Sequence, residues 1–514
     1  MKTCLYTFIL FLVFTNVFSQ TAKHYDIDVA DEHFEHKNFL TALPIYKEIL
    51  KKDKNNVELQ YKIAQCYLNT NINRTESIKY LEFCSKEPKM VTEVWLKLGT
   101  AYRLADKLDD AIGAFEKYKE LEPKKKKIAD REIEICNNAK TLMLNPVNVS
   151  FTNLGKELNS EFADYYPFVS QDENFLAFTT RRKGQTASRP ESDGYYASDV
   201  YTSKLADGKW MKAENIGTKI NSGLDEQVVG MTPDASQLLI YIDHIDKFGD
   251  IYYSTKKNGA YVKYLPFAEH INKKIEHSGS ISADGNTLFF VRANDKDDQT
   301  DIYICRKLPN GLWSEPFKMT ESVNTIYNED FPYISSDGIT LYFSSQGHNS
   351  MGGYDLFKSV WNEENNTWSQ AENLGYPLNT TDDDRSISLT PDNRIGYASA
   401  LRPGGQGDLD IYRIRFNDVE QKMKIYLGSV QLGDSLNQPK EYSVNIFVIN
   451  SKTNEEFTFV PNHNNGKLIM ALPSGYYDIV VSAEGYEDVK DKIVVSDLGI
   501  PIAEEKKNYK MIKK

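Results

Sequence analysis

The pattern of apolar and polar residues changes twice along the chain and divides it into three zones. From about residue 22 to 143 the chain reads as helices with an internal repeat. From about 148 to 415 the periodicity switches to two, and turn residues come at regular intervals, as in β-strands. From about 422 to 512 short alternating runs continue between tight turns. The pattern predicts an all-α domain followed by two all-β domains.

The helical zone carries a repeat of 34 residues that matches the tetratricopeptide (TPR) pattern. Small residues at Gly99 and Ala111 are expected to let two helices cross closely, while aromatic side chains fill the space around them. A final helix, about 128–142, would cap the stack. The residues that fit the repeat are Trp95, Leu98, Gly99, Tyr102, Ala111, Phe115 and Pro123 in the third unit, Ala64, Tyr67, Ser77 and Leu81 in the second, and Ala30, Ala42 and Tyr46 in the first.

Stacked repeats of this kind expose a concave groove formed by the first helix of each unit. Such a groove is a candidate surface for a protein partner, although its residues can equally pack within the stack or face water. The repeat register assigns these residues to it: Tyr61, Gln65, Asn69, Leu96, Thr100 and Arg103.

The middle zone contains three recurring phrases, each in five copies. One ends in an apolar residue and Asn, the second is a Ser/Thr-x-Asp turn, and the third is Asp followed by an apolar residue and an aromatic. A repeat of ~50 residues with several strands per unit predicts a β-propeller, here with five blades, a degenerate sixth being the alternative. The segment around 149–154 is expected to complete the last blade and so leave no open sheet edge. The aspartates of the third phrase are Asp199, Asp250, Asp301, Asp355 and Asp410.

The last zone predicts a small β-sandwich of about seven strands. Alternating runs lie at 424–431, 442–449, 457–460, 467–471, 476–483 and 489–495, with turns between them. The lysine-rich segment 506–514 reads as a frayed tail.

The N-terminus and the charge bear on location and partners. Lys2 followed by an apolar run from Leu5 to Val13 and by Val17-Phe18-Ser19 predicts a cleaved signal peptide at 1–19, and therefore an exported protein. The net charge of −12 argues against a nucleic-acid partner. Among the four cysteines after the predicted cleavage site, Cys66 and Cys84 are candidates for a disulfide; the alternative is that all are small buried apolar residues.

One stretch suggests catalysis. His348-Asn349-Ser350-Met351-Gly352-Gly353 is close to the G-x-S-x-G elbow of serine hydrolases. However, the residues after Gly353 read as another strand, and His stands where the elbow requires Gly. We therefore interpret the stretch as a turn between two strands of the fourth blade, whose glycines supply positive φ angles. Ser350 is expected to tolerate substitution by alanine, whereas Gly352 and Gly353 are not expected to tolerate it.

No metal or cofactor site is expected. His33 and His36 share a helix face but have no third ligand in view. Asp382, Asp383 and Asp384 open the fifth blade where single glutamates open others, and acidic residues at such turns usually accept hydrogen bonds from backbone N–H groups. Calcium binding there is the alternative, without the usual loop pattern.

The propeller phrases resemble the TolB-type, WD-repeat-like propeller of bacterial envelope proteins. The C-terminal zone is similar to carboxypeptidase regulatory-like domains through Leu472, Pro473, Gly475, Tyr476, Ala483, Gly485 and Tyr486. The residues that carry the propeller resemblance are Ser335, Asp337, Gly338, Leu341, Tyr342, Phe343, Ser345, Gly347, Gly352, Gly353 and Asp355, with Gly311, Trp313 and Pro316 before them.

The order of the three domains resembles periplasmic TPR–propeller proteins of Bacteroidetes, among them a component of the type IX secretion and gliding apparatus that usually ends in an OmpA-like, peptidoglycan-binding domain. No OmpA-like domain is recognised after residue 512, and no lipobox is recognised at the N-terminus. The resemblance implies a non-enzymatic scaffold in the periplasm, associated with the outer membrane, that binds protein partners of a secretion or motility complex. The alternatives are a glycan- or peptidoglycan-binding module and a hydrolase.

Overall fold

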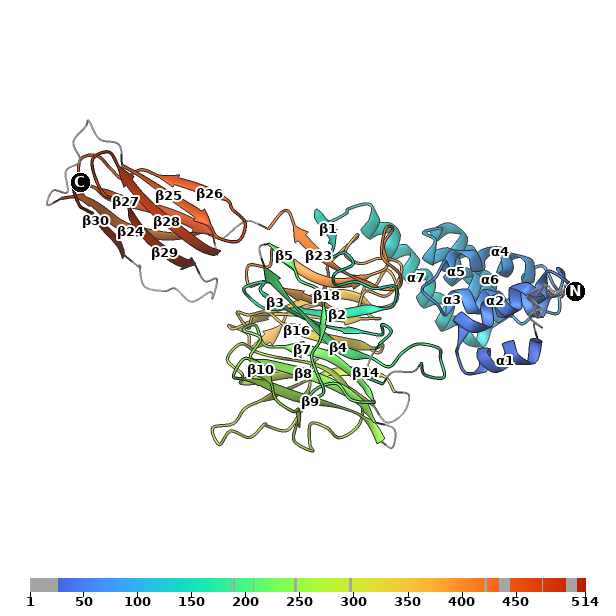
Figure 1. Ribbon diagram of the computed structural model, residues 1–514. Coiled ribbons are helices and arrows are strands. Elements are labelled where there is room, and N and C mark those ends of the chain that lie inside the picture. Colours follow the sequence, from blue (N-terminus) through green and yellow to red (C-terminus); the bar gives the residue numbers. More distant parts are fainter. Residues whose placement is uncertain are drawn as a thin grey trace, which may run out of the picture.

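The structure is a computed structural model in which the chain forms three parts. A helical part, a group of β-sheets and a smaller pair of sheets lie in a row, with the largest group in the middle (Figure 1). The predicted signal peptide lies outside the described residues. These are 26–184, 186–187, 190–206, 208–244, 247–294, 298–419, 423–433, 444–473, 475–495 and 506–514.

In the helical part, each α-helix packs against the next one along the chain. Helices α2 and α3 begin where the side chains of Asn38 and Asn56 accept hydrogen bonds from free backbone N–H groups of the first turn. No described helix is long and apolar enough to cross a membrane. The helices are α1 (Ile27–Glu35), α2 (Phe39–Leu50), α3 (Val57–Leu68), α4 (Ser77–Cys84), α5 (Glu93–Leu104), α6 (Leu108–Leu121) and α7 (Lys126–Met143), with short 3-10 turns η1 (Arg74–Glu76) and η2 (Pro123–Lys125).

The predicted close crossing at Gly99 is confirmed. A Cβ on Gly99 of α5 would lie 2.4 Å from the ring of Phe115 on α6. The Phe115 ring is fully buried, and Ala111 beside it on α6 is fully buried too. The missing side chain of the glycine is therefore what allows the aromatic ring to fill the space between the two helices.

The middle part contains five antiparallel sheets, which we call blades 1 to 5. In the first four sheets the innermost strand comes first along the chain. In the fifth sheet the outermost strand comes from the start of the region, and the other three strands follow the same order as elsewhere. Blade 1 is β2 (Asp164–Val169), β3 (Phe175–Thr180), β4 (Asp199–Ala206), β5 (Lys209–Trp210) and β6 (Glu214–Asn215); blade 2 is β7 (Asp225–Met231), β8 (Gln237–His244), β9 (Lys247–Lys257), β10 (Ala260–Tyr261) and β11 (Leu265–Pro266); blade 3 is β12 (Glu276–Ile281), β13 (Thr287–Ala293), β14 (Thr300–Arg306) and β15 (Phe317–Lys318); blade 4 is β16 (Glu329–Ile334), β17 (Thr340–Ser345), β18 (Asp355–Asn362), β19 (Thr367–Trp368) and β20 (Glu372–Asn373); blade 5 is β1 (Val149–Asn153), β21 (Ile387–Leu389), β22 (Ile395–Ala400) and β23 (Asp410–Phe416).

The blades form a closed ring, a β-propeller. The inner strand β2 of blade 1 contacts both β7 of blade 2 and β21 of blade 5. Strand β1 pairs with β23 from Val149↔Phe416 to Asn153↔Tyr412 and becomes the outer strand of blade 5. The predicted closure by the segment around 149–154 is thus confirmed, and the described residues from 149 to 416 form five sheets rather than six.

The recurring phrases hold the blades together. Asp355 accepts a hydrogen bond from the backbone N–H of Met351, and Asp410 accepts one from that of Gln406. Asn379, which ends one copy of the first phrase, bonds both the N–H and the carbonyl of Leu356. These polar residues therefore satisfy turn backbone groups in the way expected for such turns.

The C-terminal part is two sheets packed on one apolar core. The prediction of a frayed tail is wrong, because β30 pairs in parallel with β24 and buries Tyr509 and Met511. Lysines alternate with these apolar residues and conceal a period of two. The strands are β24 (Met423–Leu432), β27 (Lys467–Pro473) and β30 (Lys506–Met511) in one sheet, and β25 (Val444–Asn450), β26 (Glu456–Phe459), β28 (Gly475–Ala483) and β29 (Val489–Val495) in the other.

Candidate functional site at the junction of helices and propeller

The loop between β17 and β18 of blade 4 rests on helix α7. The guanidinium of Arg131 donates hydrogen bonds to the backbone carbonyls of Gln346 (2.6 Å), Gly347 (3.0 Å) and His348 (3.2 Å). It also lies 4.6 Å from the ring centroid of Tyr327. One arginine from the helices thus binds three successive peptide groups of the propeller, which fixes the loop in position.

The same loop inserts a methionine between the helices. Met351 is fully buried in an apolar cluster with Phe115, Cys136 and Ala139 of α6 and α7. On α7, Asn138 donates a hydrogen bond of 3.0 Å to the Ser350 carbonyl. The cluster therefore belongs to two domains at once, and separating them would expose its apolar surface to water.

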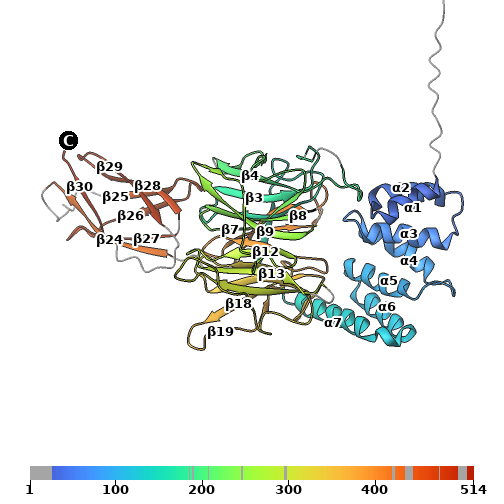
Figure 2. The same ribbon diagram turned by 90° about the horizontal axis from the view of Figure 1, so that it is seen from below.

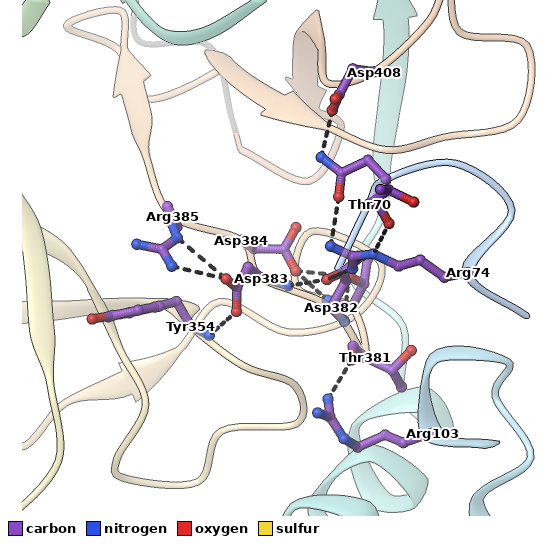
Figure 3. A network of polar contacts seen from close by, with 12 residues as sticks. Thr70, Arg74, Arg103, Tyr354, Thr381, Asp382, Asp383, Asp384, Arg385 and Asp408 are labelled. Carbon is purple, nitrogen blue, oxygen red and sulfur yellow. Dashed lines mark hydrogen bonds and ion pairs between the residues drawn. The ribbon is translucent and has the colours of Figure 1, made fainter. Parts of the chain in front are cut away.

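A second loop, between blades 4 and 5, contacts the turns of the helical part (Figure 3). Arg74 of η1 binds both carboxylate oxygens of Asp382, at 2.5 and 2.6 Å. Arg103 at the end of α5 donates to the carbonyl of Thr381, and the Thr381 hydroxyl donates to Asp106 at 3.0 Å. This ion pair and its neighbours anchor the helices over one end face of the propeller.

Ser350 belongs to this junction and lacks the surroundings of a nucleophile elbow. The chain continues after it into strand β18, not into a helix. Its hydroxyl is buried and donates to the carbonyl of Gly353 at 3.1 Å. The Nε2 atom of His348 lies 2.9 Å from the Val323 carbonyl.

The expected reason for the glycines of this loop is wrong. Gly352 and Gly353 do not have positive φ angles; the residue of the loop that does is His348, at 45°. A Cβ on Gly352 would instead lie 2.2 Å from the Asp382 carbonyl oxygen. Close approach of two backbone segments therefore requires glycine here, and both segments belong to the surface that holds the helices.

Asp382, Asp383 and Asp384 each have a different partner. Asp382 binds Arg74, Asp383 pairs with Arg385 at 3.0 Å, and Asp384 accepts from the backbone N–H and hydroxyl of Thr380. Burial raises the pKa of Asp384 to about 7. The described residues contain no group of three or more potential ligands that could hold a metal ion.

Blades 2 and 4 have an acidic residue at the position of Asp384. Glu226 and Glu329 bond the backbone N–H groups of Ser222 and Thr325 four residues earlier, as the turn interpretation predicts. Neither glutamate has a basic partner among the described residues, and burial raises the pKa of each to about 7.

Asp164 and Glu276 take the same position in blades 1 and 3, where they accept from the backbone N–H groups of Ser160 and Lys274. The residues that follow the five acids differ in type, and three of them are in contact with one another. His277 lies 3.3 Å from Asp330, and the Arg385 guanidinium lies 4.0 Å from the same carboxylate. Burial disfavours the charged imidazole, but the Asp330 carboxylate outweighs it and raises the pKa of His277. The five residues that follow the acids are Tyr165, Gln227, His277, Asp330 and Arg385.

The predicted groove residues fall into two groups. Arg103 is buried and is used by the propeller junction. Leu96 packs at the edge of the cluster that surrounds Met351, and Thr100 bonds the Leu96 carbonyl at 3.1 Å. Three residues on or directly after α3 have no hydrogen bond or ion pair to the propeller within the part of the chain that the structure describes: Tyr61, Gln65 and Asn69.

The remaining candidates are the histidine pair at α1 and the two cysteines considered for a disulfide. The Nδ1 atom of His36 lies 2.8 Å from the Glu32 carbonyl one helical turn earlier, and His33 lies in the last turn of the same helix. Cys66 and Cys84 are buried free thiols, and burial raises the pKa of Cys84 to about 11.

Sequence reasoning did not find Arg74, Arg131 or Asn138, because arginine and asparagine on a helix surface have no distinctive pattern. One signal was present. Met351 stands four residues before the recurring Asp355, where blade 5 has Gln406 before Asp410. An apolar residue at a turn position that is polar in the neighbouring repeat indicates a contact outside the blade.

Comparison with known proteins yields no matching family model and no matching curated protein. Solved structures that the chain resembles include TolB from Acinetobacter baumannii (14% identity over 56% of this chain and 70% of that one, TM-score 0.34) and a putative TolB from Agrobacterium tumefaciens (15%, 53% and 99%, 0.28). An endo-arabinase from Bacteroides thetaiotaomicron is similar at the same level (15%, 53% and 98%, 0.32). These scores are low, so the propeller assignment rests on the order of the strands.

Proposed function

We propose that this chain is an exported, non-enzymatic scaffold that binds protein partners in the periplasm, at the outer membrane, within a type IX secretion or gliding machinery. In this proposal the helical part is a TPR stack, the middle part a TolB-like propeller and the last part a regulatory-like sandwich. The assignment to that machinery rests on the resemblance of the sequence and domain order.

The single observation that carries the scaffold proposal is the junction of helices and propeller. Arginines at three places along the helical part, Arg74, Arg103 and Arg131, bind the propeller, and Met351 is buried between the two domains. A junction of this kind holds two binding surfaces in a fixed relative orientation. Fixed geometry reduces the entropy lost when a partner binds both platforms at once.

The polar residues that repeat in the blades also favour a scaffold. The aspartates and asparagines of the phrases are used for turn backbone groups, and Ser350 is used in the junction. These particular groups therefore have structural roles, which supports a scaffold.

The experiment places a photo-crosslinking residue at Gln65 in cells that export the protein, and identifies the adducts by mass spectrometry. Gln65 lies on α3, away from the propeller junction, whereas a change at Arg103 would disturb the junction itself. We expect a specific envelope-protein adduct at this position. In a separate assay, we expect Gln65→Arg to reduce secretion or motility.

Gly113→Arg is the matched control, because a Cβ at Gly113 of α6 meets open space and the same charge is added. If Gln65 yields no adduct and Gln65→Arg leaves secretion and motility as in the wild type, the groove does not bind a partner.

A further inference from the structure

A cavity of about 340 Å³ lies where the helical part covers the mouth of the propeller axis. Its walls come from both domains: Asn71 and Arg74 from the helices, and Tyr165, Tyr166 and Gln227 from blades 1 and 2. The volume lies in the range of small-molecule sites, ~300–1,000 Å³. We propose that this cavity binds a small, uncharged, polyhydroxylated ligand, a saccharide unit, between the two domains.

The charges of the cavity argue for an uncharged ligand. Three arginines face three aspartates, Asp382, Asp383 and Asp384. Each arginine already has a carboxylate partner: Arg74 binds Asp382, Arg385 binds Asp383, and Arg181 lies 3.1 Å from Glu191. A charged ligand would have to compete with one of these partners for its arginine or carboxylate.

The remaining hydrogen-bonding groups both donate and accept. Within the described residues, the side-chain amide of Gln227 and the hydroxyl of Tyr166 have no hydrogen-bond partner, and both residues line the cavity. A ligand that satisfies an amide and a phenol together needs donors and acceptors close to each other, as the hydroxyl groups of a sugar provide.

Aromatic rings at the mouth supply the apolar part of such a site. Tyr165 and Tyr166 meet edge to face at 4.6 Å between centroids, and Tyr166 lies against Phe331 at 4.1 Å. Tyr166 and Phe331 both have positive φ angles, 53° and 43°. Bulky residues in this region are strained, and such strain is concentrated at ligand sites and switches.

The covering helices favour a small ligand over a protein. Asn71 donates to Asp408 on one side of the cavity and Arg74 binds Asp382 on the other, so the turn between α3 and η1 spans the mouth. A folded partner cannot enter beneath this turn while the junction is intact. Asp382 also lines the cavity, so a bound ligand contacts the loop that holds the helices.

The test is saturation-transfer NMR on the full chain with N,N′-diacetylchitobiose and cellobiose as sugar probes and triglycine as a peptide probe. We expect transfer to at least one sugar and none to triglycine. Gln227→Ala and Tyr166→Phe should each weaken sugar binding about 3- to 10-fold, the effect of losing one neutral hydrogen bond.

Gln370→Ala, on an exposed segment of blade 4, is the matched control and should leave binding unchanged. Tyr166→Phe keeps the ring and the fold, and its melting temperature checks this. No transfer to either sugar, transfer to triglycine instead, or sugar binding that neither variant weakens would each overturn the proposal. None of these outcomes bears on the groove around Gln65.

Discussion

The propeller lies between the helices and the sandwich (Figures 1 and 2) and is joined to them by different kinds of contact. Toward the helices it presents two loops that bury Met351 and receive Arg74 and Arg131. Toward the sandwich, the described residues contribute one hydrogen bond, from Lys452 to the carbonyl of Asp172.

A cleft of about 480 Å³ separates the propeller from the sandwich, lined by charged and polar groups including Glu173 and Arg413. The helical junction, in contrast, combines buried apolar surface with charge-assisted hydrogen bonds, which water cannot easily replace. We therefore expect the helices and propeller to move as one body, whereas the sandwich is held by a contact as weak as a surface interaction.

The largest effect should come from Met351→Asp. A carboxylate in the cluster with Phe115 and Cys136 is expected to destabilise docking by more than the ~2–5 kcal/mol typical of Met→Ala in a core. The helices should separate from the propeller, which limited proteolysis of the segment between α7 and β1 detects. Met211→Asp, at a site that is 53% exposed, is the control and should behave as wild type.

Gly352→Ala should cause the next largest loss of thermal stability, and Ser350→Ala a much smaller one. The alanine Cβ would clash with the carbonyl of Asp382, a backbone atom that cannot move without displacing the loop bound to Arg74. Ser350→Ala loses one hydrogen bond, about 1 kcal/mol. Thermal unfolding compares the two, and equal losses would show that the close approach is not the reason for the glycine.

The helical junction should weaken as pH rises. Burial raises the pKa of Asp384 above its unfolded value, so its contribution to stability is present at low pH and is lost as pH rises through about 7. Asp384 anchors the turn that presents Thr381 and Asp382 to the helices. We expect a melting temperature several degrees higher at pH 6 than at pH 8, with a smaller difference in Asp384→Asn; an unchanged difference would contradict this role.

Lys452→Ala should have the smallest effect. It removes the hydrogen bond to the Asp172 carbonyl and the cation–π contact of the Lys452 ammonium, which lies 4.4 Å from the Tyr476 ring centroid. The free energy of unfolding is expected to change by less than about 1 kcal/mol, and chemical denaturation measures it. A loss as large as that of Met351→Asp would remove the contrast between the two junctions.

The sequence allowed the blades to be counted because the same phrases recur in each repeat, and in blades 4 and 5 Asp355 and Asp410 have the same turn role. It did not predict the junction, since Arg131 binds backbone carbonyls, which any residue provides. It also missed β30, where lysines between Tyr509 and Met511 conceal the alternation. Local periodicity depends on the side chains of residues close together in the sequence, whereas contacts between domains depend on where separate segments meet in space.

The most direct test measures two distances in one protein by double electron–electron resonance. Spin labels at Lys117 on α6 and Asn365 in blade 4 report the helical junction, and labels at Asn365 and Asn464 report the sandwich junction. The native cysteines should resist labelling, because burial raises the pKa of Cys136 and Cys305 to about 11. We expect a narrow distance distribution for the first pair and a broad one for the second; equal widths, or a broad first distribution, would contradict the rigid junction.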